Sequence, residues 1–149
     1  MDTTAVLAAQ LQDSPDVLDA LELAWSGAWS TVDPCLLELC RLQVATILQC
    51  HSELAARTPA AVAAGFDEAK SSALGSAWES PLFSETERAC LAFTDSFVMD
   101  VASLSDETAA AVSSQLGASG LVDFASALLI VEQRQRLALA WTALFGELP

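Results

Sequence analysis

The chain has 149 residues, of which 53% are apolar, and it carries a formal net charge of −14 with a mean hydropathy of +0.42. This length suits one domain with a substantial core. The chain has only six Lys and Arg residues but 20 Asp and Glu residues, so we expect no nucleic-acid partner and no binding to an anionic membrane surface.

Composition also sets expectations for assembly and location. A chain this apolar, with 17% charged residues, should cover part of its surface with another copy of itself, which predicts a homo-oligomer. The longest uncharged run, 108–122, contains two glycines and is shorter than the roughly 20 apolar residues of a membrane span, so we expect none. The first residues, MDTTAVLAAQLQD, lack a basic leader, and we expect a cytoplasmic protein.

The four cysteines are Cys35, Cys40, Cys50 and Cys90. We expect reduced thiols, because the core is ample and no secretory signal is visible. There is no C-x-x-C pair, and a single histidine gives no zinc-ligand spacing. Glycine-rich phosphate loops are also missing, so the sequence predicts no metal and no cofactor.

Residues that typically start or end helices recur along the whole chain. Ser14 and Asp33 each precede a proline, which is typical of a helix start, and Ser84 with Glu87 forms a capping box. No period-2 strand pattern is present. The expected helices lie near 3–11, 15–29, 34–57, 59–65, 67–78, 85–101, 105–117 and 119–141. The sequence therefore predicts an all-α single domain, 1–149, of about seven or eight helices, with 1–32 as an N-terminal helical extension and 33–149 as the core.

The segment from Asp33 to Arg57 contains most of the candidate reactive side chains. It is apolar on nearly every side, as expected for a buried helix. Cys50, Glu53 and Arg57 are spaced i, i+3 and i+7, which on one helix places them within roughly 60° of each other. One interpretation is a plain Glu53–Arg57 ion pair beside an inert cysteine. The other is a pocket in which Glu53 is an acid/base and Arg57 anchors an anionic or carbonyl oxygen.

The same segment resembles the carboxymuconolactone decarboxylase and AhpD-like alkylhydroperoxidase family. The family pattern E-L-x-R-L-x-V-A-x-x-x-x-C is matched from Glu38 through Arg41 to Cys50. The stretch P-L-F-S-E-T-E-R-A-C-L, 81–91, resembles a second family motif, and Arg136 resembles the arginine of the last helix. The likeness covers roughly residues 33–141 and implies an AhpD-like helical bundle.

The chain departs from the family at its reactive groups. The resemblance to the peroxidase branch implies C-x-x-C-x-x-x-H, in which the second cysteine attacks the peroxide and the first resolves it. Here Cys50 matches the first cysteine, Glu53 stands at the second, and Arg57 replaces the histidine. His51 is one residue out of register. The decarboxylase branch often has glutamate where Glu53 stands, but it also keeps the histidine.

Three hypotheses follow for this divergent chain. The first is cofactor-free acid–base chemistry on a small carboxylated or lactone-type substrate, with Glu53 as acid/base, Arg57 as anchor and Glu38 as a supporting carboxylate. The second is a one-cysteine hydroperoxide-reducing or thiol-sensing protein acting through Cys50. The third is an oligomeric binding protein without catalysis. The predicted site residues are thus Glu38, Cys50, Glu53 and Arg57.

Geometry sets a condition on any shared site. On one straight helix Glu38 lies about 18 Å from Cys50, at 1.5 Å per residue. The two can meet only if the chain turns near Leu48–Cys50, where no Gly or Pro marks a break. The alternative for Glu38 is a buried pairing with Arg41.

Overall fold

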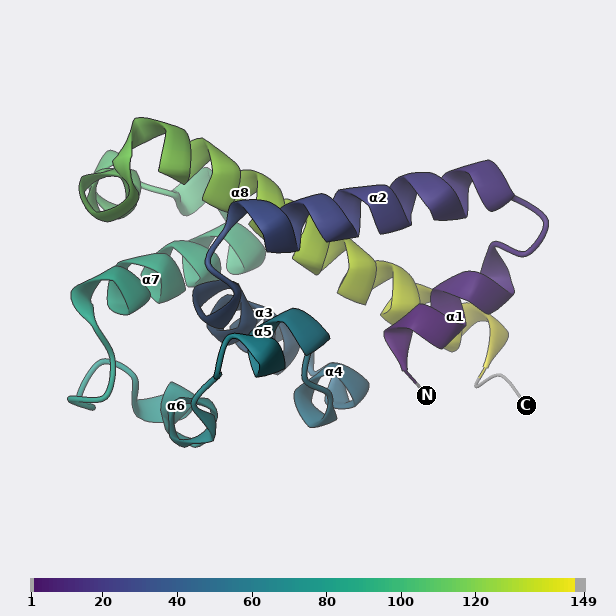
Figure 1. The fold of residues 1–149 in the computed structure, drawn as a ribbon, viewed down its shortest axis with the longest axis horizontal. Helices are drawn as coiled ribbons and strands as arrows, with labels where there is room; N and C mark the ends of the chain where they lie inside the picture. The colour runs from purple at the N-terminus through teal and green to yellow at the C-terminus, as the bar shows by residue number, and fades with distance from the viewer. Residues whose placement is uncertain (1, 147–149) are drawn as a thin grey trace.

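The computed structural model describes residues 2–146, and within them the chain is all helical, as predicted (Figure 1). The α-helices are α1 Thr3–Gln10, α2 Pro15–Thr31, α3 Pro34–Leu48, α4 His51–Ala55, α5 Pro59–Ala63, α6 Glu68–Ala73, α7 Glu85–Met99 and α8 Asp106–Phe145. Two short 3-10 helices, η1 Leu74–Ser76 and η2 Val101–Ser103, follow α6 and α7.

Helix α3 is the centre of the fold. Its residues from Leu36 to Leu42 are all buried, and the helix packs against both α7 and α8. Asp33 accepts a hydrogen bond from the Leu36 backbone N–H, so the predicted Asp-Pro start is confirmed. Because every residue of α3 from Leu36 to Leu42 is buried, the apolar residues of this helix form one core with those of α7 and α8.

Helix α8 is the longest element and bends at Gly117, whose φ of 80° is non-helical. Figure 1 shows its C-terminal part crossing the molecule beneath α2 and reaching α1. By length and composition α8 is the one helix among residues 2–146 that could cross a membrane, a test that core helices of soluble proteins also pass. The bend separates the two helices that we expected at 105–117 and 119–141.

The central segment does not form one helix over 34–57. Helix α3 ends at Leu48, Gln49 adopts a left-handed conformation (φ 56°), and Cys50 precedes the five-residue α4. The Gln49 and Cys50 N–H groups bond back to carbonyls of the last turn of α3. The chain therefore turns at the point where the resemblance required it, without glycine or proline.

Candidate functional site

A buried arginine links α3 to the segment that follows the turn. Arg41 is 1% exposed and forms a fork with Glu38, with Nε–Oε2 at 2.9 Å and Nη2–Oε1 at 2.8 Å. Its Nη1 also donates to the Glu53 carboxylate and backbone carbonyl, and Nη2 donates to the Ala56 carbonyl. One guanidinium thus holds two carboxylates and two carbonyls.

The charge state of this cluster follows from its partners. Burial by itself would lower the pKa of Arg41, but hydrogen bonds and charges from Glu38 and Glu53 outweigh it, and the net pKa is raised. Glu38 also accepts bonds from the Thr58 hydroxyl at 2.8 Å and the Thr58 N–H at 3.3 Å. The two hydrogen bonds between Arg41 and Glu38 confirm the alternative interpretation of Glu38, which was a buried pairing with Arg41.

The predicted Glu53–Arg57 pair is wrong. Helix α4 ends at Ala55, so the i,i+4 geometry that the prediction required does not exist. Arg57 instead forks onto Glu68, with Nε–Oε1 at 2.7 Å, and donates to the Ser71 hydroxyl. Hydrogen bonds from Arg57 hold the pKa of the Glu68 carboxyl below its usual value, although burial acts in the opposite direction. Arg57 therefore ties α4 to α6 and does not meet Glu53.

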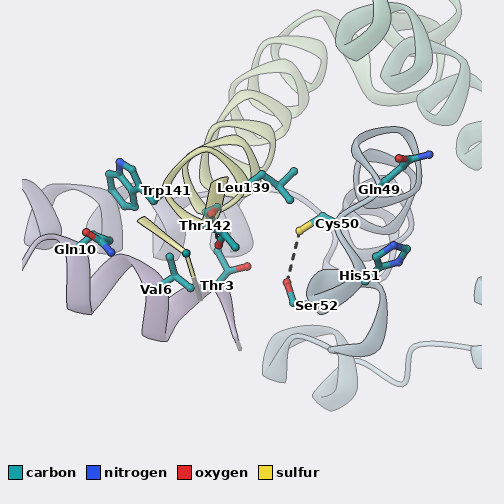
Figure 2. Close-up of a pocket in the computed structure, with 12 residues that line it drawn as sticks. Thr3, Val6, Gln10, Gln49, Cys50, His51, Ser52, Leu139, Trp141 and Thr142 are labelled. Atoms are coloured by element: carbon teal, nitrogen blue, oxygen red, sulfur yellow. Dashed lines mark hydrogen bonds between the residues drawn. The ribbon is translucent and has the colours of Figure 1, made fainter. Parts of the chain in front are cut away.

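A pocket of about 460 Å³ opens beside the turn at Gln49, and neither Arg41 nor its two glutamates line it (Figure 2). Its walls come from three distant parts of the chain: one side of α1, the turn and first residues of α4, and the end of α8 with the residue after it. The lining residues are Thr3, Val6, Gln10, Gln49, Cys50, His51, Ser52, Ala138, Leu139, Trp141, Thr142 and Gly146. Its volume falls in the range of small-molecule sites, roughly 300–1,000 Å³.

Cys50 is the thiol of this pocket. Its side chain is enclosed, with 1% exposure, and Sγ lies 3.6 Å from the Ser52 hydroxyl. Figure 2 shows this pair facing α1 and the end of α8, whereas the His51 ring points to the other side of the turn. The described lining residues include no carboxylate, ammonium or guanidinium side chain. The pocket is thus a neutral chamber with one sulfur.

Thr3 supplies an unsatisfied group to the same chamber. Its residue is 2% exposed, and its hydroxyl finds no hydrogen-bond partner within the described part of the chain. Figure 2 shows the hydroxyl oxygen directed toward the Cys50 and Ser52 side of the pocket. A buried hydroxyl without a partner costs about 1–3 kcal/mol, which a polar ligand in the pocket would recover.

Of the four predicted site residues, only Cys50 lines this pocket. Glu38 and Glu53 are brought together, but by Arg41 and inside the core, and Arg57 lies on the outer side of α4 with Glu68. Sequence reasoning missed Thr3 and Ser52. Ser52 lies within the segment from Asp33 to Arg57, two residues after Cys50, but Thr3 lies 47 positions before Cys50, and no local pattern connects them.

The remaining cysteines lie in a different environment. Cys40 and Cys90 are fully buried in the core. Burial, with added charges from neighbouring groups, raises the pKa of the Cys40 thiol strongly and that of the Cys90 thiol to about 12. The Cys35 pKa is raised as well, mainly by burial, although that thiol is partly exposed.

These environments predict a selective thiol map. At pH 8 we expect iodoacetamide to leave Cys40 and Cys90 unmodified in the folded protein, because reaction requires an accessible thiolate. Peptide mass spectrometry after brief alkylation measures this, and a urea-unfolded sample in which all four cysteines react is the control. Rapid labelling of Cys40 or Cys90 in the native protein would contradict the core packing described here.

Comparison with known proteins bears on the fold. No family model and no curated protein matches this sequence. A crystal structure from Agrobacterium tumefaciens superposes with a TM-score of 0.76 at 18% sequence identity, covering 90% of this chain and 93% of that one. The chain has the AhpD-like fold. The Agrobacterium protein is itself described as a protein of unknown function and a candidate antioxidant defence protein AhpD.

The AhpD-like fold confirms the architecture expected from the resemblance. Because the identity is 18%, the likeness extends to the fold and not to the reaction. Within the AhpD-like fold, the turn at Gln49 places Cys50 against the pocket, and Arg41 fills the space between the two glutamates.

Proposed function

We propose that this protein is a one-cysteine thiol protein that reduces, or senses, small organic hydroperoxides through Cys50. The observation that supports the proposal is the position of Cys50 alone, among the predicted site residues, on the wall of a ligand-sized pocket. The two glutamates that acid–base chemistry would use are bound to Arg41 instead. The antioxidant description of the Agrobacterium protein agrees with this choice.

The pocket suits a small neutral molecule. Its described walls combine apolar groups, such as Val6 and Leu139, with uncharged hydrogen-bonding groups, such as Thr3 and Ser52. A chain of net charge −14 repels anions at long range, and Arg57, the anchor expected for a carboxylated substrate, is engaged with Glu68. We therefore favour a neutral alkyl hydroperoxide over the carboxylated or lactone-type substrate of the first hypothesis.

The chemistry requires one thiol and an external reductant. The Cys50 thiol gives up its proton and attacks the terminal peroxide oxygen, so an S–O bond forms and the O–O bond breaks. The released proton joins the departing alkoxide, which leaves as the alcohol. Cys50 is oxidised to sulfenic acid and the hydroperoxide is reduced. A small thiol then condenses with the sulfenic acid and releases water, and a second thiol frees Cys50 as a disulfide of the two small thiols leaves. The Ser52 hydroxyl, 3.6 Å from Sγ, can donate a hydrogen bond to the sulfur or the departing oxygen.

A trapping experiment tests this proposal. After treatment with a modest excess of cumene hydroperoxide and then dimedone, we expect a dimedone adduct on Cys50 and none on the core thiols Cys40 and Cys90. Peptide mass spectrometry gives the site, and protein treated with dimedone alone is the control. Cys50 that stays unmodified while the peroxide is present would overturn the proposal.

A further inference from the structure

Three of the described residues that line the Cys50 pocket carry a hydroxyl group, and they differ in whether its hydrogen already has an acceptor. The Thr142 hydroxyl donates to the Ala138 carbonyl, one turn earlier on α8, at 2.8 Å. The Ser52 hydroxyl lies 3.6 Å from Cys50 Sγ. The Thr3 hydroxyl is buried, faces the Cys50 side of the pocket (Figure 2), and has no hydrogen-bond partner among residues 2–146. Of the three, Thr3 is therefore the hydroxyl that is free to donate to a bound molecule.

The start of α1, which carries Thr3, is fixed to the rest of the protein. The hydroxyl of the next residue, Thr4, accepts a hydrogen bond from Arg134 Nη2 at 2.8 Å. The same guanidinium donates to Glu22 at 3.0 Å and lies 4.5 Å from the ring centre of Trp25. These contacts join α1 to both α2 and α8, and Arg134 itself is buried. Because α1 is already in place, a molecule that bonds to Thr3 does not have to order this helix.

We propose that Thr3 is a specificity-determining residue of the Cys50 pocket and that its hydroxyl donates a hydrogen bond to an acceptor oxygen of the bound molecule. The ligand class is then a small neutral molecule that carries such an oxygen, in preference to a hydrocarbon of the same shape. An organic hydroperoxide is one member of this class, so the inference deepens the function proposed above and rests on it for the identity of the substrate.

The preference follows from the cost of an enclosed polar group that has no partner. A molecule with an acceptor oxygen gives Thr3 the bond that it lacks within the described part of the chain. A hydrocarbon fills the same space and displaces water, but it leaves the hydroxyl unpaired and gains only from contact with apolar groups such as Val6 and Leu139. Sites that hydrogen-bond a ligand therefore discriminate against an analogue without the polar group more strongly than sites that recognise shape alone.

Two probes of nearly the same shape isolate the contribution of the oxygen. Acetophenone has a carbonyl oxygen that accepts hydrogen bonds and cannot donate them, and α-methylstyrene has a methylene group in its place. Binding to the isotope-labelled full chain is followed by NMR through the indole N–H of Trp141, which lines the pocket. We expect Thr3→Val to raise the dissociation constant of acetophenone at least about fivefold, as for one lost hydrogen bond, and not to weaken binding of α-methylstyrene.

A second threonine in the pocket provides the matched control. Thr142→Val removes a hydroxyl whose hydrogen is already bonded to the backbone, so both probes should bind as they do to the unmodified protein. Thr3→Ser keeps the hydroxyl and should keep acetophenone binding within about twofold of the unmodified protein. Equal weakening of both probes by Thr3→Val would show a role in shape alone and would overturn the proposal. Acetophenone that binds the unmodified protein and Thr3→Val equally well, or that does not bind up to its solubility limit, also overturns it.

Thermal unfolding tests the same hydroxyl without a ligand. Thr3→Val replaces a buried, unpartnered hydroxyl by a methyl group, so we expect the melting temperature to rise by about 2 °C or more. An unchanged or lower melting temperature would show that the hydroxyl already has a stabilising partner, and it would overturn the proposal.

These outcomes are separate from those of the dimedone experiment on Cys50. Acetophenone binding that depends on Thr3, in a protein whose Cys50 forms no adduct, would leave the specificity site standing and remove the hydroperoxide chemistry. A Cys50 adduct together with acetophenone binding that does not depend on Thr3 would do the reverse.

Discussion

Replacing Arg41 by methionine is expected to lower the free energy of unfolding by about 3–5 kcal/mol, which is the usual effect of removing one partner from a buried ion pair. Arg41 is 1% exposed and holds Glu38, Glu53 and the Ala56 carbonyl. Without the guanidinium, two buried carboxylates lose their cation, and the carbonyls of Glu53 and Ala56 lose their donor. Since single domains are stable by about 5–15 kcal/mol, the loss is a large part of the total.

Urea unfolding followed by circular dichroism measures the effect. Arg57→Met is the matched control, because Arg57 also forks onto a glutamate but does so at the surface, where the Glu68 side chain is 61% exposed. Such a pair is worth about 0–1 kcal/mol, so we expect a much smaller change. Equal losses for the two variants would show that the Arg41 cluster is not the clamp between α3 and α4 that its contacts indicate.

Replacing Cys50 by serine is expected to reduce thiol-dependent hydroperoxide consumption to the level of the buffer. Serine keeps the shape and the hydrogen-bonding capacity of the position, so the pocket is retained, but its hydroxyl cannot form the sulfenic acid intermediate. The assay follows loss of cumene hydroperoxide with dithiothreitol as the external thiol. Cys35→Ser, which removes the partly exposed thiol beyond the pocket, should keep the full rate.

Comparison of Cys50→Ser with the unmodified protein separates the remaining hypotheses. If Cys50→Ser and the unmodified protein both consume hydroperoxide at the same rate, the thiol chemistry is excluded. If neither consumes it but the unmodified protein still forms sulfenic acid at Cys50, the sensing form of the proposal stands. Comparison of the two proteins by circular dichroism confirms that any difference in rate does not come from unfolding.

The all-helical fold follows from local sequence signals. The Asp33–Pro34 start and the Ser84–Glu87 capping box both form the hydrogen bonds that their types predict. These signals are local because a cap satisfies backbone groups within one turn. The end of α3 was not foreseeable in this way, because Gln49 adopts a left-handed conformation that its residue type does not favour.

The candidate site was predicted only in part, for a related reason. Glu53 and Arg57 were expected to pair because they are four residues apart, but the helix that would align them ends at Ala55. Their real partners, Arg41 and Glu68, are 12 and 11 positions away. Spacing predicts contacts only while a helix continues, and whether α4 continues depends on what packs around it.

The sequence by itself determined that the chain is helical, that the apolar residues between Leu36 and Ala45 are buried, and that Cys50 lies in the segment with the reactive groups. Only the tertiary structure decided which of those groups line a pocket. The turn at Gln49 directs Cys50 toward a pocket built with α1 and the end of α8, while Arg41 holds both glutamates in the core. The physical reason is that helix periodicity acts over one or two turns, whereas a pocket and a buried ion cluster depend on segments that meet only when the core forms.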